Sequence, residues 1–371
     1  MDFFATAAHG TEPALRDELR ELGFRAVRAD RGGVHFSGRD RLDGARACLL
    51  SRIAVRIHLP LGSFDAPNEK ALYAGVRGLD LAPYLTPRHT LAISAVTQRS
   101  NLTHTQYLAQ LVKDAIVDAQ RDRTGARSSV DARSPDVRLF LHLRKDVGTL
   151  YLDLAGEPLH LRGYRTLVGE APLKETLAAA IVRFSGWDRV SPLVDPMCGS
   201  GTLAIEADLL ARQVPPGLLR RNLGFTRWAS HDATEAEGLR ALHESLPGRV
   251  RAEGPDVRGS DRDPTIIDAA QKNARAATAK VAFSVADVRD LRPSSPPGTV
   301  LINPPYGGRL ETTLDAWRDL GRVLRTLHGH RVAVLCPGPD YERALDLPRG
   351  DHDPELRNGD LTCRLLVRAI P

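Results

Sequence analysis

The feature that most restricts the fold of this chain is a regular alternation of short apolar segments and helical segments from residue 173 onward. The segments that read as buried strands are 192–195, 257–261, 281–287, 299–302, 331–337 and 361–370. Helical periodicity marks residues 175–187, 201–213, 264–278 and 312–328. Short apolar strands separated by helices of this length predict a parallel sheet covered by helices on both faces. Ligands of such sheets bind beyond the carboxyl ends of the strands.

The first 160 residues lack this alternation and are predicted to form two smaller α+β units. In the first unit we expect strands at 2–8 and 32–38 and helices at 12–22 and 41–53. In the second we expect a turn at 60–65, a strand at 91–98, a helix at 103–122, and a hairpin of 137–144 with 148–156. A stretch rich in Gly, Pro and charge then suits a connector. The expected division is 1–60, 61–160, a linker at 161–172, and 173–371.

Composition is that of an ordinary globular protein. With 371 residues, of which 42% are hydrophobic and 26% charged, the chain can bury a core. The four cysteines form no CxxC pair and the twelve histidines form no HxxxH or HExxH pair, so neither disulfides nor a metal site are expected. The N-terminus has no basic region, and the longest apolar runs are far shorter than the ~18 residues of a membrane span. We therefore expect a soluble, cytoplasmic monomer that binds no metal and no membrane.

The excess positive charge is confined to one segment. Residues 51–150 hold 14 Lys and Arg against 9 Asp and Glu, whereas the remainder holds 37 of each sign. A local excess of this kind is typical of a surface that contacts phosphates, because basic side chains attract a polyanion and release its counterions. An ordinary solvated surface with mixed charges remains the alternative interpretation.

Residues 195–202, DPMCGSGT, lie between a predicted strand and a predicted helix. Glycines there allow a tight turn and let backbone N–H groups at the helix start approach a ligand. The run GSGTLA also fits the G-x-G-x-x-A pattern of dinucleotide-binding folds, which requires an acid about 20 residues later. No acid stands there, but Asp261 ends the next strand. If residues 214–250 are an insertion, Asp261 occupies the place of a ribose-binding acid.

Asn303, Pro304, Pro305 and Tyr306 directly follow the predicted strand 299–302. The prolines stiffen the backbone and lack N–H groups, so the Asn303 amide oxygen and the Pro304 carbonyl are acceptors in a fixed geometry. Two acceptors suit an exocyclic amine, whose lone pair is delocalised and which must be oriented towards an electrophile. Tyr306 can stack on an extruded base. The motif therefore indicates chemistry on an amino nitrogen.

Together, DPMCGSGT and NPPYG resemble the motifs of class I S-adenosylmethionine (SAM)-dependent methyltransferases that modify amino nitrogens. The segments FFATAAHGTEPALRDEL, GEAPLKETLAAAIVRFSGW, PPGLLRRNLGF and NGDLTCRLL are similar to the THUMP-domain RNA guanine-N2 methyltransferases of the RlmL/TrmN type, over essentially the whole chain. The resemblance implies an α/β fold in which ferredoxin-like and THUMP α+β units precede a Rossmann-like methyltransferase sheet. It departs at Gly308, where the family often has Glu.

The resemblance also implies roles for individual residues. The turn at Gly199–Gly201 would receive the methionine part of SAM, and Asp195 would lie beside its ammonium group. Asp261 would bind both ribose hydroxyls, and Asp287 would accept a hydrogen bond from the adenine amine. A strand-end aspartate such as Asp261 is otherwise often a helix cap. The implied cofactor-binding set is Asp195, Pro196, Cys198, Gly199, Ser200, Gly201, Thr202, Asp261, Asp287 and Asn303. The implied catalytic set is Asn303, Pro304, Pro305 and Tyr306.

The function we expect is methyl transfer from SAM to the exocyclic N2 of a guanosine in structured RNA. We favour 23S rRNA over tRNA because the insertion and the C-terminal NGDLTCRLL look closer to the rRNA branch. A DNA adenine-N6 methyltransferase, a protein-glutamine methyltransferase and a non-catalytic RNA-binding protein are the alternatives. Cys336 before Pro337 suggests the nucleophile of a cytosine-C5 methyltransferase, but a cysteine at a strand end is more often merely buried.

Overall fold

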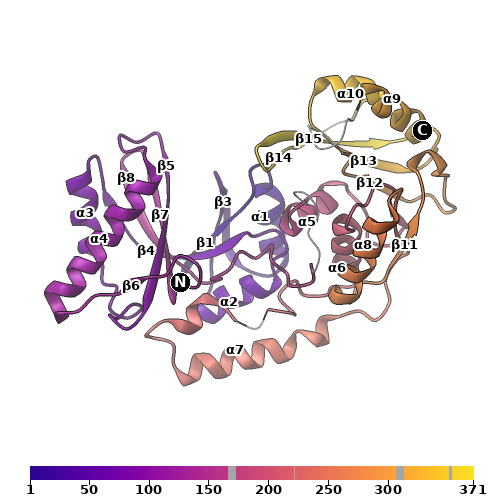
Figure 1. The fold of residues 1–371 in the computed structure, drawn as a ribbon. Coiled ribbons are helices and arrows are strands. Elements are labelled where there is room, and N and C mark those ends of the chain that lie inside the picture. The colour runs from indigo at the N-terminus through magenta and orange to yellow at the C-terminus, as the bar shows by residue number, and fades with distance from the viewer. Residues whose placement is uncertain (166–172, 221, 306–312, 351–352) are drawn as a thin grey trace.

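The computed structural model describes residues 1–165, 173–220, 222–305, 313–350 and 353–371. Residues 166–172 of the expected linker, and the motif residues Tyr306 and Gly308, lie outside this set. Within the described ranges the strands form two sheets, one of eight strands from the first part of the chain and one of seven from the last part. Figure 1 shows the first sheet at the left and centre of the molecule and the second at the right. The α/β fold class is thereby confirmed.

The N-terminal sheet has the strand order β2-β3-β1-β4-β8-β7-β5-β6. Its strands are β1 (Asp2–Thr6), β2 (Arg25–Asp30), β3 (Gly33–Ser37), β4 (Arg56–Asp65), β5 (Thr90–Gln98), β6 (Ser129–Val130), β7 (Val137–Arg144) and β8 (Val147–Asp153). Its helices are α1 (Glu12–Glu21), α2 (Arg41–Leu50), α3 (Glu69–Arg77) and α4 (Thr105–Thr124). The antiparallel pairing of β7 with β8 confirms the predicted hairpin.

The prediction of a turn at 60–65 is wrong. The chain stays extended through Asp65 as part of β4, which pairs with β1 at one edge and with β8 at the other. Pro60 has no N–H to donate, and the register with β8 shifts between Pro60 and Gly62, so the strand accommodates the proline at an irregularity. As a result β4 joins the two N-terminal units into one continuous sheet.

The two faces of this sheet differ. Along β7, Val137, Leu139, Leu141 and Leu143 are fully buried, and the residues between them project from the other face. These four residues belong to one hydrophobic cluster with residues of α1, α2, α3 and α4. The four helices therefore cover the apolar face of the sheet, and the opposite face carries arginine, histidine and aromatic side chains.

The C-terminal sheet has the order β11-β10-β9-β12-β13-β15-β14. Its strands are β9 (Leu193–Asp195), β10 (Val257–Asp261), β11 (Val281–Val285), β12 (Thr299–Ile302), β13 (Arg331–Cys336), β14 (Glu355–Asn358) and β15 (Leu361–Ala369). Its helices are α5 (Glu175–Phe184), α6 (Thr202–Ala211), α8 (Pro264–Ala277), α9 (Leu314–Arg325) and α10 (Pro339–Leu345). β9 to β13 pair in parallel, as the alternation predicts. The last two strands are antiparallel.

A 3₁₀ segment, η3 (Val288–Asp290), lies between β11 and β12. The expected insertion between α6 and β10 contains α7 (Ala233–Ser245) and the short 3₁₀ segments η1 (Gly224–Arg227) and η2 (Pro247–Arg249). It packs on the N-terminal part of the molecule. Glu235 of α7 pairs with Arg41 of α2 at 2.5 Å, and Phe225 and Trp228 join the N-terminal hydrophobic cluster. The insertion thus ties the two sheets together.

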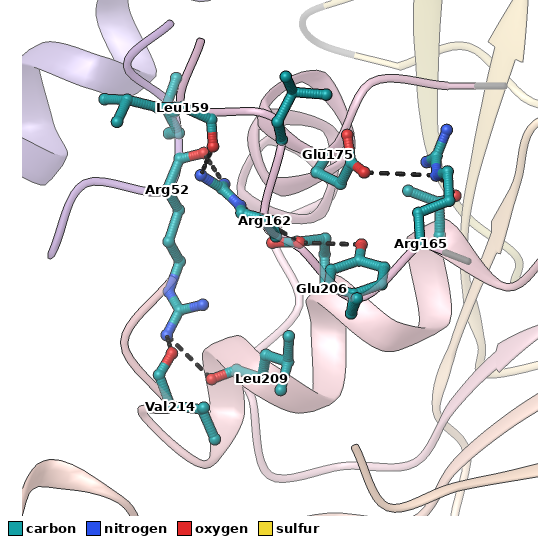
Figure 2. Close-up of polar contacts among 12 residues, drawn as sticks. Arg52, Leu159, Arg162, Arg165, Glu175, Glu206, Leu209 and Val214 are labelled. Carbon is teal, nitrogen blue, oxygen red and sulfur yellow. Dashed lines mark hydrogen bonds and ion pairs between the residues drawn. The ribbon is translucent and has the colours of Figure 1, made fainter. Parts of the chain in front are cut away.

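The described part of the connector is packed rather than exposed. Arg162 and Tyr164 are buried, and both face Glu206 of α6: Nε of Arg162 lies 3.6 Å from Oε1, and the Tyr164 hydroxyl donates to Oε1 at 3.1 Å. Figure 2 shows Arg162 also donating to the backbone carbonyl of Arg52, whose guanidinium in turn reaches the carbonyl of Leu209. The two parts of the chain are therefore joined through buried charged groups.

No helix within the described ranges is both long and apolar enough to cross a membrane. Over the same ranges, no group of three or more His, Cys, Asp or Glu side chains is placed to hold a metal ion.

Candidate active site

Asp195 ends β9 and its carboxyl group is buried. Its Oδ1 accepts from the N–H of Met197 at 3.3 Å, and among the described residues it has no cation as an ion-pair partner. Burial raises the pKa of Asp195 to about 8, and the negative charge of Asp261 adds to the effect. A buried carboxyl group without a cation is a suitable receptor for an ammonium group, which would restore its ionised form.

The turn after β9 contains two glycines with left-handed backbone. The φ angle is +52° at Gly199 and +85° at Gly201, a region that favours glycine. A Cβ on Gly201 would lie 2.7 Å from the ring of Phe283, whereas a Cβ on Gly199 would meet no atom within 4 Å. Gly201 is therefore required for close packing on β11. Gly199 borders open space at the N-terminus of α6, where backbone N–H groups can receive a ligand.

Asp261 at the end of β10 is hydrogen bonded to this turn. Its Oδ2 accepts from the N–H of Gly199 at 3.1 Å, and its Oδ1 accepts from the N–H of Asp263 at 3.1 Å. The N-cap of α8 is Asp263, whose side chain accepts from Thr265. The capping role that a strand-end aspartate often has is thus filled by Asp263. Asp261 instead lies against the turn predicted to receive methionine.

Asp287 follows β11 and remains ionised. Its carboxylate accepts from the backbone N–H of Arg289 at 2.9 Å and from the Arg289 guanidinium at 2.9 and 2.8 Å. These bonds lower the pKa of Asp287 to about 2. The neighbouring Ala286 donates its N–H to the carbonyl of Asp261 at 3.0 Å, which links the two strand ends. An amine that bound to Asp287 would either share its carboxylate with the exposed Arg289 guanidinium or displace that guanidinium.

Asn303 leaves the sheet at the end of β12, directly beside β9. Pro304 is buried, and Asn303 and Pro305 are partly buried. The Oδ1 atom of Asn303 is buried and has no hydrogen-bond partner within the described part of the chain. Leaving a buried acceptor unpaired costs about 1–3 kcal/mol, so this oxygen is suited to a donor from a bound molecule. Tyr306, the remaining predicted catalytic residue, lies outside the described residues.

Residues that the sequence analysis did not single out also shape the turn. The guanidinium of Arg165 donates to the hydroxyl of Thr202 at 2.9 Å, and its Nε lies 3.3 Å from Oε1 of Glu175 (Figure 2). Asn273 of α8 donates to the carbonyl of Ser200 at 3.1 Å. Arg165 was missed because it lies in a segment that reads as a connector, and no local pattern marks which arginine of a connector folds back.

Cys336 ends β13 and is buried. Its Sγ donates to the carbonyl of Gly338 at 3.3 Å, and burial raises the pKa of the thiol to about 11. A thiol that stays protonated is a poor nucleophile, because the thiolate is the attacking species. These observations favour a packing role for Cys336.

Three known domain families match the chain in order. Residues 2–58 match the RlmL ferredoxin-like domain, residues 66–153 the THUMP domain, and residues 162–337 the RMKL-like methyltransferase domain. The third match contains the glycine turn, Asp261, Asp287 and Asn303.

Among curated proteins, the chain is similar to the ribosomal RNA large subunit methyltransferase K/L of Magnetococcus marinus, with 38% identity over 98% of this chain and 52% of that protein. The chain thus spans about half the length of this curated relative.

Two solved structures share the whole architecture. One, from Clostridium difficile 630, is described as a possible methylase and is 27% identical with a TM-score of 0.89. The match covers 100% of this chain and 98% of the Clostridium difficile chain. The other, described as a methyltransferase complexed with SAH, is 28% identical with a TM-score of 0.86 over the same shares of the two chains. The chain therefore contains, in order, segments that match an RlmL-type ferredoxin-like domain, a THUMP domain and an RMKL-like methyltransferase domain.

Proposed function

We propose that this chain transfers a methyl group from SAM to the exocyclic N2 of a guanosine in structured RNA, and that the RNA is 23S rRNA. The relative from Magnetococcus marinus carries the name of a large-subunit ribosomal RNA methyltransferase, which supports rRNA as the substrate. The THUMP match and the excess of positive charge in residues 51–150 support an RNA partner.

The observation that carries the proposal is the unpartnered Oδ1 of Asn303 at the end of β12. An oxygen accepts a hydrogen bond, so the group that completes this site is a donor such as an amine. The next residue, Pro304, cannot donate from its backbone, and its carbonyl is a second acceptor. Guanine N2 carries two N–H groups and so matches a pair of acceptors.

The residues around the glycine turn fit SAM. Asp195 would pair with the ammonium group, the turn at Gly199 would receive the methionine part, and Asp261 would accept from the ribose hydroxyls. Asp287 would accept from the adenine amine. Bound SAM supplies an electrophilic methyl group on a sulfonium sulfur.

In the proposed reaction Asn303 and Pro304 hold the target nitrogen towards the methyl donor. Hydrogen bonds from the two N–H groups to these oxygens favour the pyramidal nitrogen that develops during attack. Tyr306 would stack on the extruded base. The methyl group would pass directly to nitrogen as its bond to the sulfonium sulfur breaks, leaving a neutral thioether, and the nitrogen would lose one proton to solvent. No covalent bond would form between the protein and the RNA.

We further propose that the chain acts as a cytoplasmic monomer. We also propose that its domains are 1–60, 61–160 and 173–371, with a linker at 161–172. The matches to residues 2–58 and 66–153 support the first two domains of this division, whereas the third match begins at residue 162 and so includes most of the proposed linker. The packing of Arg162 and Arg165 supports a linker that helps to hold the domains together.

The test is to incubate the full chain with labelled SAM and, in separate reactions, with unmodified transcripts of 23S rRNA and tRNA, with DNA, and with protein. We expect label in 23S rRNA, recovered as N2-methylguanosine after digestion to nucleosides. Label confined to tRNA would move the substrate to the alternative RNA class. Label in N6-methyladenine of DNA, or in protein, would overturn the proposal.

A further inference from the structure

The face of the N-terminal sheet that α1 to α4 leave uncovered contains a cavity of about 560 Å³. We call it the sheet-face cavity and define it by lining residues from β1, β4, β5, β7 and β8, with β4 at the join of the ferredoxin-like and THUMP parts. Its volume falls in the range typical of ligand sites. It shares no lining residue with the glycine turn or with Asn303, so it is separate from the candidate active site.

Stacked rings line this cavity. The rings of His58 and Phe140 are 5.0 Å apart at 28°, and those of Phe140 and His142 are 6.3 Å apart at 11°. Tyr151 packs beside Phe140 at 6.0 Å. Aromatic side chains set side by side on a sheet provide a platform on which a planar base can stack, whatever the base.

His58 supplies an unsatisfied polar atom at this platform. Its side chain is only 2% exposed and lines the cavity, and its Nδ1 has no hydrogen-bond partner within the described residues. Burial lowers the pKa of His58 to about 4, so the ring is neutral at physiological pH. A buried polar atom normally has a partner, so Nδ1 marks a position where a ligand donates or accepts a hydrogen bond.

The charge of the cavity favours an anion. Arg31, Arg56 and Arg138 line it, against the single carboxylate of Asp153 in the described lining. Arg56 forms an ion pair with Asp153, and Arg56 and Arg138 both donate to the carbonyl of Gly156, at 3.0 and 3.1 Å. Because Asp153 is paired with Arg56, the positive charges of Arg31 and Arg138 are not balanced by a carboxylate of the described lining. The cavity therefore combines a stacking surface with positive charge.

We propose that the sheet-face cavity binds an unpaired nucleotide of the substrate RNA, with its base on Phe140 and its phosphate near Arg138 and Arg31. This inference rests on the proposed function, because it takes RNA as the substrate. Bases in an A-form duplex are paired and stacked on each other, whereas unpaired nucleotides can place a base on an aromatic ring. The cavity therefore selects single-stranded RNA beside the structured region that is methylated.

The test compares two charge-introducing variants of the full chain. Val96 lines the cavity and is 48% exposed, whereas Val130 on β6 does not line it and is 58% exposed. Val96→Glu adds a carboxylate to the lining of the cavity, opposite His142 on β7, and should weaken binding of a short fluorescent single-stranded oligoribonucleotide about tenfold or more, because the carboxylate repels the phosphates of a strand that enters the cavity. Val130→Glu, the matched control, should bind as the wild type does. Fluorescence anisotropy measures both affinities.

A second pair of variants tests stacking. Phe140→Leu removes the ring and should weaken single-strand binding about tenfold, whereas Phe140→Trp keeps a ring and should bind within about twofold of wild type. Thermal unfolding identifies any variant that does not fold, and in that case the two valine variants decide.

Methyl transfer to 23S rRNA is measured in parallel. If the wild-type chain methylates no RNA, the proposed function fails. If it methylates RNA but Val96→Glu binds the single strand as tightly as Val130→Glu does, the cavity proposal alone is overturned. Tighter wild-type binding to a blunt duplex than to the single strand would also overturn it.

Discussion

The guanidinium of Arg165 donates a hydrogen bond at 2.9 Å to the hydroxyl of Thr202, the first residue of α6. The same guanidinium pairs with Glu175 on α5, at a place where both side chains are largely buried. The connector is thus bonded directly to the helix that begins at the glycine turn. The position of the turn therefore depends on a residue from outside the alternating strands and helices.

Arg165→Ala should lower the free energy of unfolding by about 3–5 kcal/mol, because removing one partner leaves Glu175 as an uncompensated buried charge. Denaturant titration measures the change. Arg318 pairs with Asp315 on the exposed surface of α9, and Arg318→Ala should change the free energy by no more than about 1 kcal/mol. Equal effects of the two substitutions would show that the Arg165 pair does not anchor the turn.

Asp261→Ala should weaken SAM binding by about 1.5–3 kcal/mol, because it removes a charged acceptor for two hydroxyls and leaves the N–H of Gly199 without its partner. Calorimetric titration of the full chain measures the affinity. Asp268 is an exposed carboxylate on α8 that pairs with Lys272, so Asp268→Ala is the matched control and should bind SAM normally. Unchanged affinity in Asp261→Ala would reject the assignment.

SAM binding should tighten as the pH rises from 6 to 7.5, because the pKa of Asp195 is about 8 and only its ionised form pairs with an ammonium group. The free protein holds a proton on Asp195 below this pKa and releases it on binding. The amino group of SAM stays mostly charged in this range, since α-amino groups titrate near pH ~7.7–8.0. Calorimetry in buffers of different ionisation enthalpy measures the released proton.

The control for this pH dependence is Asp195→Asn, which should bind SAM more weakly and with little dependence on pH over the same range. A wild-type protein that releases no proton on binding would contradict the pairing of Asp195 with the ammonium group.

Asn303→Ala should lower the rate of methyl transfer strongly and leave folding and SAM affinity nearly intact. The Oδ1 of Asn303 has no hydrogen-bond partner among the described residues, so the loss of this oxygen removes no hydrogen bond to them. Its contact is made to an amine whose geometry changes during attack, and so counts more in the transition state than in the ground state. Single-turnover assays measure the rate. A fully active Asn303→Ala enzyme would overturn the amine-directed mechanism.

Cys336→Ser should retain methyl transfer, because the buried thiol has a raised pKa and already donates to the carbonyl of Gly338. Denaturing gels of the protein with labelled RNA should show no covalent complex. Loss of activity in a correctly folded Cys336→Ser protein, or a stable protein–RNA adduct, would point to a cysteine nucleophile.

The sequence by itself determined the features that depend on neighbouring residues. The buried strand 299–302 followed by Asn303 and two prolines is a local pattern, and so is the glycine turn between β9 and α6. Strands and helices alternate in the chain because each buried apolar strand needs a covering helix, and this restricts the topology to a few arrangements. The positions of the two motifs and the alternation of strands and helices in the C-terminal sheet therefore follow from sequence.

Only the tertiary structure decided what depends on contacts between distant segments. Residues 60–65 have the composition of a turn, but pairing with β8 keeps them extended, because the hydrogen bonds between paired strands outweigh a local preference. Arg165 meets Thr202, and His58 meets Phe140, only after the chain has folded. Side-chain partners of this kind are set by the geometry of packed elements, and one sequence carries no local signal for them.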